Sequence, residues 1–87
     1  MFRMTIEDVF AIRGRGTVAT GRVESGQLRV GDEVRVNGVL SVRVDGIEAF
    51  RKTLDQANVG DNIGVLFKSL ERSQLDRGDV LTAPSVV

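Results

Sequence analysis

The residues best suited to bind a ligand lie in the short segment from Glu48 to Lys52, which reads EAFRK. A carboxylate such as that of Glu48 can accept a hydrogen bond from a ribose hydroxyl. An arginine such as Arg51 can pair with a phosphate or stack on a base. The alternative is structural: Glu48 and Arg51 form an exposed ion pair over Phe50, which adds little to stability. These residues alone favour the structural alternative.

The chain lacks most of the residue types that catalysis and metal binding require. The chain contains neither cysteine nor histidine, which excludes zinc fingers, Ser-His-Asp and Cys-His catalysis, and most transition-metal sites. The acids include two adjacent pairs, Glu7-Asp8 and Asp32-Glu33, but adjacent side chains of a strand face opposite ways. Neither pair suggests a shared proton, so the sequence predicts a protein that is not an enzyme and has no metal and no cofactor.

The glycine-rich segment from Gly14 to Gly21 resembles a phosphate-binding loop but lacks its working parts. The spacing from Gly16 to Gly21 fits a P-loop, yet Arg22 and Val23 stand where a lysine and a hydroxyl residue must follow. A dinucleotide-binding pattern can also be fitted from Gly14, but no β-α unit surrounds it. Nucleotide binding by this loop is therefore not expected.

Length, charge and hydropathy indicate a small soluble domain. The 87 residues suffice for a single domain spanning residues 1–87 with a modest core. Twelve basic and twelve acidic residues cancel, so non-specific binding to nucleic acid is not predicted. Ten of the basic residues are arginines, however, which suit local recognition of phosphate. No signal peptide and no stretch near ~18 apolar residues is present, so we expect a cytoplasmic protein with no membrane partner.

The elements that must position these side chains are short strands. β-Prone residues predict about six strands, in the segments 4–12, 17–24, 28–36 (with a turn at 31–32), 40–47, 63–67 and 80–81. A helix pattern also fits part of 4–12, but its β-branched residues favour a strand. We expect a kink at Glu7-Asp8 and an extended or irregular segment over residues 48–54. A short helical turn over residues 70–75 should end at Gly78, and Pro84 should end the last strand.

Turn signals separate these strands. Asn37-Gly38 is the strongest hairpin signal, since both residue types tolerate positive φ. Further turns are predicted at residues 25–26, 30–32 and 59–61, and the last two share the sequence Val-Gly-Asp. The tripeptide Arg77-Gly78-Asp79 matches an adhesion motif by its letters only. Turns every eight to twelve residues and no long helix indicate an all-β, antiparallel fold, either a barrel or a sandwich.

Three ordered segments carry a resemblance to a known family. They read EDVFAIRGRGTVATGRVESGQLRVGDEV, then GIEAFRKTLDQANVGDNIGVLF, then RGDVL. Together they resemble domain 2 of elongation factor Tu and of related translational GTPases, from Ile6 to Pro84. The resemblance implies a six-stranded antiparallel closed β-barrel, in agreement with the strand pattern.

The same resemblance implies a role for particular residues. In that family the barrel holds the aminoacylated 3′-terminal adenosine of transfer RNA. Glu48 matches the glutamate that contacts the ribose beside the adenine, and Arg51 matches the arginine near the terminal phosphate. Leu66 matches a leucine that lines the adenine pocket. The implied RNA-end-binding residues are Glu48, Arg51, Leu66, Ile12 and Val18, and Arg22 matches an arginine near inter-domain surfaces.

The sequence also departs from the family pattern. Ser25 stands where the family usually has arginine, and Ala49 replaces a bulkier residue, which could loosen the pocket floor. The GTPase domain and the third domain have no counterpart in these 87 residues, so we expect weak binding of an aminoacyl-tRNA acceptor end or the ribosome. Partners could include the missing GTPase domain or another protein. The alternative function is a protein-docking barrel that has lost RNA binding.

Overall fold

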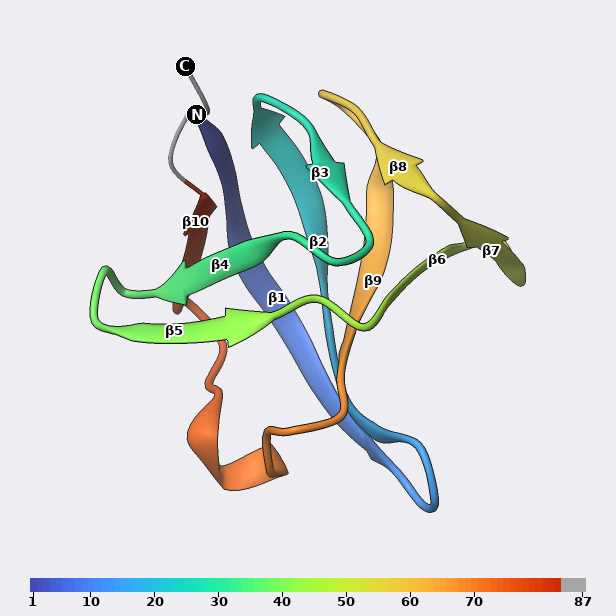
Figure 1. The fold of residues 1–87 in the computed structure, drawn as a ribbon, viewed down its shortest axis with the longest axis vertical. Helices are drawn as coiled ribbons and strands as arrows, with labels where there is room; N and C mark the ends of the chain where they lie inside the picture. Colours follow the sequence, from blue (N-terminus) through green and yellow to red (C-terminus); the bar gives the residue numbers. More distant parts are fainter. Residues whose placement is uncertain (84–87) are drawn as a thin grey trace.

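A computed structural model describes residues 1–83 of the chain (Figure 1). The described residues form ten strands and one short 3₁₀ helix, η1 (Arg72–Gln74). The strands are β1 (Phe2–Ile12), β2 (Gly16–Ser25), β3 (Leu28–Arg29), β4 (Glu33–Val36), β5 (Leu40–Arg43), β6 (Gly46–Ala49), β7 (Lys52–Leu54), β8 (Gln56–Ala57), β9 (Asn62–Phe67) and β10 (Val80–Ala83). The all-β prediction is confirmed. Pro84, expected to end the last strand, lies outside the described residues.

Eight strands form one antiparallel sheet in the order β5-β4-β10-β1-β2-β9-β6-β7, and β3 pairs with β8 separately. The long strands β1 and β2 form its centre, and β9 lies alongside β2 (Figure 1). One face of the sheet curves around the core, because inward residues alternate with outward ones along each strand. The largest fully buried side chains include Phe67, Met4, Ile6, Leu28 and Ile47.

The expected kink at the acidic pair is a β-bulge. Ile6 pairs with Gly21 and Asp8 pairs with Thr20, so Glu7 is an extra residue on β1. The Asp8 carboxylate accepts a hydrogen bond from the Val9 amide at 3.0 Å. A bulge reverses the alternation of the strand that carries it. Met4 and Ile6 face the core before the bulge, and Val9 does so after it.

The predicted closure into a six-stranded barrel is not observed in the described residues. The ladder leaves β5 and β7 as edges, because each has only one neighbour in the sheet. After β5 the chain makes isolated contacts instead: the Val44 amide donates to the Asp32 carbonyl at 2.8 Å, and the Asp45 amide donates to the Leu66 carbonyl at 2.9 Å. The predicted strand over residues 40–47 is thus two strands, β5 and β6. Isolated hydrogen bonds connect residues 44 and 45 to the rest of the chain where a continuous ladder was expected.

Three turns share one construction. In the turns that end at Asp32, Asp61 and Asp79, the aspartate carboxylate accepts a hydrogen bond from the amide three residues earlier, at 2.8, 2.8 and 3.0 Å. The glycine before each aspartate has positive φ, between 89° and 96°. The first two turns were predicted from their shared sequence. The third turn contains Gly78 and explains the Arg-Gly-Asp tripeptide, whereas the short helix already ends at Gln74.

Candidate functional site: the outer face of β2, β9 and β6

A small apolar area lies on the outer side of the sheet, away from the core. Val18 on β2 and Leu66 on β9 are direct partners in the ladder. Only 8% of Val18 and 6% of Leu66 is exposed, yet neither belongs to the main hydrophobic core cluster. Their inward neighbours, Ala19 and Val65, do belong to it. Val18 and Leu66 therefore form the floor of a separate apolar surface.

One aromatic and one aliphatic side chain of β1, Phe10 and Ile12, extend this surface. Because the bulge reverses the alternation of β1, Phe10 and Ile12 face outward beyond it. Phe10 is the ladder partner of Val18 and is 49% exposed, and Ile12 is half-buried at the end of the strand. The resemblance implied that Ile12 belongs to the binding surface, whereas Phe10 was not predicted to lie there.

Two glycines keep this face shallow. A Cβ added at Gly64 would lie 3.0 Å from Cγ1 of Val18, and one added at Gly46 would lie 3.5 Å from the Leu66 side chain. Gly64 lies between Thr20 and Glu48 in the ladder, and Gly46 is the partner of Leu66. Larger residues at these two positions would cover Val18 and Leu66, so the glycines leave room for a ligand.

A depression of about 340 Å³ opens beside Leu66, and we call it the Leu66 depression. It is lined by Gly14, Arg15, Asp45, Gly46, Ile47, Glu48, Thr53, Leu66 and Lys68. Nη2 of Arg15 donates to Oε1 of Glu48 at 2.6 Å across it. This pair replaces the Glu48–Arg51 pair of the structural interpretation. Both side chains are about half exposed or less, so the pair adds at most about 1 kcal/mol.

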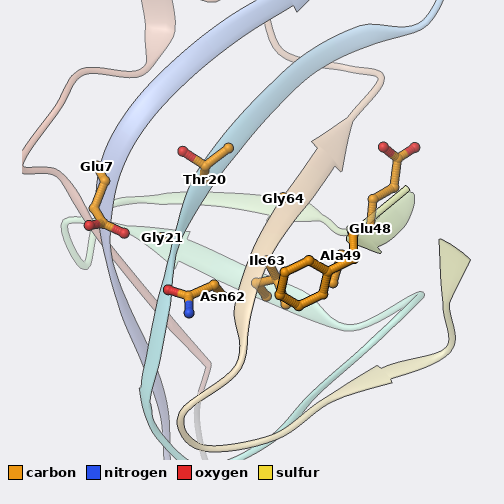
Figure 2. A pocket seen from close by; sticks show the side chains of 9 residues that line it. Glu7, Thr20, Gly21, Glu48, Ala49, Asn62, Ile63 and Gly64 are labelled. Atoms are coloured by element: carbon orange, nitrogen blue, oxygen red, sulfur yellow. The ribbon is translucent and has the colours of Figure 1, made fainter. Parts of the chain in front are cut away.

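A second depression, of about 260 Å³, lies on the other side of Glu48 (Figure 2), and we call it the Asn62 depression. It is lined by Glu7, Thr20, Gly21, Glu48, Ala49, Phe50, Asn62, Ile63 and Gly64. Figure 2 shows Glu7 and Thr20 at one end of this group and Glu48 at the other, across β9. Glu48 lines both depressions, so the two lie on either side of this one residue.

The β6–β7 hairpin ends beside these depressions in an unusual turn. Ala49 pairs with Lys52, which leaves Phe50 and Arg51 as a two-residue loop. Both have positive φ, 50° and 64°, a conformation that costs a bulky residue roughly 1–2 kcal/mol. An extended or irregular segment was predicted here, because the dipeptide Phe-Arg is not typical of such a turn. Arg51 is exposed at the tip and forms no ion pair within the described residues.

The comparison with known families agrees with this arrangement. The sequence model described as Elongation factor Tu domain 2 matches residues 16–82, most of the chain. The chain belongs to this family. It is therefore a translation-factor-like β-domain, and the resemblance read from its sequence is confirmed.

Within this elongation factor Tu domain 2 fold, the implied site residues fall into three groups. Leu66, Val18 and Glu48 are brought together on the outer face. Arg51 lies at the hairpin tip that follows Glu48. Ile12 and Arg22 line neither depression, and Arg22 is exposed on β2 opposite Asn62. The contribution of Arg15 was missed, because it lies 33 residues before its partner.

One carboxyl outside the outer face is electrostatically distinct. The Thr5 hydroxyl donates to Oε2 of Glu24 at 2.6 Å, and the Thr5 amide donates to the same atom at 2.8 Å. Nε of Arg3 pairs with Oε1 at 3.1 Å. Led by the Thr5 hydroxyl bond, these contacts lower the pKa of Glu24 below its usual 4.5. This cluster stabilises the start of β1 against the end of β2.

Two kinds of feature are absent from residues 1–83. No group of three or more acidic side chains is arranged to hold a metal ion. No helix there is long and apolar enough to span a bilayer.

Proposed function

We propose that this domain binds the aminoacylated 3′-terminal adenosine of transfer RNA on the outer face of β2, β9 and β6. The observation that carries the proposal is the position of Glu48 between two adjoining depressions, one of which is floored by apolar Leu66. An aminoacyl-adenosine has the matching parts: a flat apolar base, a ribose with hydroxyl groups, and an appended aminoacyl group. Family membership supports the same ligand.

Each part of this ligand has a partner of suitable chemistry. The base would lie against Leu66, and the Glu48 carboxylate would accept a hydrogen bond from a ribose hydroxyl. Arg15 holds the Glu48 side chain in place by pairing with it. The aminoacyl group would then extend into the Asn62 depression, where Asn62 and Thr20 offer polar contacts. Arg51 at the hairpin tip would meet the terminal phosphate.

The proposed role is recognition without catalysis. We propose that the domain works in the cytoplasm with the ribosome, and that any GTP hydrolysis belongs to a separate GTPase domain. A shallow site with one apolar floor and few polar groups supports weak binding by this chain alone.

The test is an NMR titration of the labelled protein with an aminoacylated acceptor-stem RNA at two salt concentrations. We expect localised shifts at Glu48, Arg51 and Leu66. Arg51→Ala should lower the affinity about tenfold, since a charge-assisted phosphate contact is lost. Arg35→Ala is the matched control, because Arg35 is an exposed arginine on the distant strand β4. Equal weakening by both variants would reduce the effect to general charge, and silence at millimolar RNA would reject the proposal.

A specific observation also favours the alternative, a protein-docking role. Val39 and Leu40 are exposed, by 85% and 39%, at the β4–β5 hairpin, and β5 is an edge of the sheet. Edge strands with exposed apolar residues can pair with a partner. Sedimentation velocity over a range of protein concentrations tests this alternative. Self-association that Leu40→Lys abolishes, without any response to RNA, would favour it.

A further inference from the structure

The dipeptide Asn37-Gly38 at the tip of the β4–β5 hairpin has a chemistry of its own. In an Asn-Gly sequence the glycine amide nitrogen can attack the side-chain amide of asparagine, because glycine has no side chain to hinder the approach. Both residues are exposed to water. The other two asparagines of the chain, Asn58 and Asn62, precede valine and isoleucine, whose branched side chains hinder this attack. Asn37 is therefore the asparagine of this chain most prone to deamidation.

The reaction needs only water. The Gly38 amide nitrogen loses its proton to solvent and bonds to Cγ of Asn37, which closes a succinimide ring. The side-chain nitrogen takes up a proton and leaves as ammonia. Water then adds to one ring carbonyl and breaks the bond from that carbonyl to the ring nitrogen. The product at position 37 is aspartate or isoaspartate, and the net change is one water consumed and one ammonia released.

The contacts of Asn37 oppose this reaction in the folded protein. Nδ2 of Asn37 donates to Oδ1 of Asp79 at 3.1 Å, and Oδ1 of Asn37 accepts from the Val80 amide at 2.9 Å. The Asn37 amide also donates to the Val80 carbonyl at 2.8 Å. Ring closure carries Cγ to the Gly38 nitrogen and removes Nδ2 from the side chain, so these side-chain bonds must break first. The hairpin must therefore open locally before Asn37 can react.

The product no longer fits the contact with Asp79. Deamidation replaces the Nδ2 donor with a carboxylate oxygen, which would face Oδ1 of Asp79 across a hydrogen-bond distance. Two carboxylates placed so closely repel each other. Asp79 directly precedes β10, which lies between β1 and β4 in the sheet. Loss of this contact therefore loosens the junction between the hairpin and β10.

We propose that Asn37 is a deamidation site that its native contacts protect, and that its reaction releases the β4–β5 hairpin from β10. Because the ammonia is lost to solvent, the release is one-way. The extent of reaction then records how often this hairpin has opened. Neither Asn37 nor Asp79 lines the two depressions of the outer face, so this inference stands apart from the proposed RNA binding.

Mass spectrometry of tryptic digests tests the protection. Cleavage after Arg35 and Arg43 gives the peptide 36–43, in which Asn37 is the only asparagine. In mildly alkaline buffer the folded protein should deamidate about thirtyfold more slowly than the same chain unfolded in urea, since two side-chain hydrogen bonds must first break. Equal rates in the folded and unfolded chains would overturn the proposal.

Two aspartate variants show whether the contact itself protects. Asp79→Ala should speed deamidation of the folded protein about tenfold, because the charge-assisted bond to Nδ2 is lost. Asp61→Ala is the matched control, since it removes the equivalent turn bond, to the Asn58 amide, at another turn. No acceleration by Asp79→Ala, or equal acceleration by both variants, would reject a protective contact.

The variant Asn37→Asp tests the consequence of the reaction. Hydrogen exchange of the Val80 amide, which bonds to the residue 37 side chain, should be about tenfold faster than in wild type. Adding Asp79→Asn places an amide donor opposite a carboxylate again and should restore the wild-type rate. An unchanged rate in the single variant, or no rescue in the double variant, would show that deamidation does not release the hairpin.

Discussion

The two hairpins β4–β5 and β6–β7 use the same left-handed backbone at their tips but very different residues. Asn37 and Gly38 have φ of 52° and 72°, and Phe50 and Arg51 have φ of 50° and 64°. Asparagine and glycine are the residues that this conformation favours, whereas phenylalanine and arginine are not. The residue types of the first tip therefore suit its backbone conformation. Those of the second tip do not, and we infer that they are present for their side chains.

The contacts of the two tips differ in the same sense. The Asn37 side chain donates to Oδ1 of Asp79 at 3.1 Å and accepts from the Val80 amide at 2.9 Å. The Asn37 amide also donates to the Val80 carbonyl at 2.8 Å. Through these bonds the first tip is fastened to the start of β10. Phe50 has no polar side-chain atom for such bonds and is 90% exposed, so the second tip holds its strain without such a fastening.

The largest effect is expected when the second tip sequence is placed in the first hairpin. The double variant Asn37→Phe with Gly38→Arg should lose about 3 kcal/mol or more of unfolding free energy. Two residues would then be held at unfavourable φ, and the bonds from the Asn37 side chain to β10 would be gone. Urea unfolding measures the loss. A loss below about 1 kcal/mol would mean that the hairpin changes its turn at little cost.

The reciprocal exchange should have a smaller effect of opposite sign. Phe50→Asn with Arg51→Gly should raise the free energy of unfolding by about 1–2 kcal/mol, because both new residues accept positive φ. The same variant should lose RNA-end binding. Urea unfolding and the RNA titration of one sample measure both. If stability does not rise, the tip stores no strain, and the contrast between the hairpins is one of sequence only.

The smallest effect concerns pH and should leave the contrast untouched. Since the pKa of Glu24 is lowered in the folded protein, its stabilising effect is complete above its usual 4.5. It is lost as pH falls from there through the folded-state pKa. Glu24→Gln should flatten the fall in stability between about pH 5 and pH 3. Urea unfolding across this range checks it, and both tip variants should keep the wild-type slope, since Glu24 lies in a separate cluster.

The two hairpins also show what the sequence could predict. The Asn37-Gly38 turn was foreseeable, because its residues, its conformation and the alternation of its strands agree. The second turn was not, because Phe50 and Arg51 oppose the conformation that the rest of the structure imposes on them. Secondary structure and family followed from local patterns. Local residue preferences do not predict the turn at this candidate site, because Phe50 and Arg51 are not residues that the turn favours.

The outer face was hidden from the sequence for a different reason. The kink at Glu7-Asp8 was predicted. Its effect on the later residues of β1 was not, because the pairing with β2 shows that β1 has one extra residue there, which exchanges the inward and outward faces of the strand. That reversal turns Phe10 outward.

The Arg15–Glu48 pair and the open edges of the sheet likewise depend on contacts between distant segments. The hydrophobic periodicity of a single strand does not predict such contacts.

The place of β10 in the sheet has a consequence for the order of synthesis. Residues 80–83 lie between β1 and β4, so the last strand of the described residues is the neighbour of their first strand. Until those residues leave the ribosomal tunnel, no strand joins β1–β2–β9 to β4–β5 in the ladder. The nascent chain therefore exposes the edges of β1 and β4 throughout its elongation. The sheet of residues 1–83 is therefore completed only after β10 has been translated.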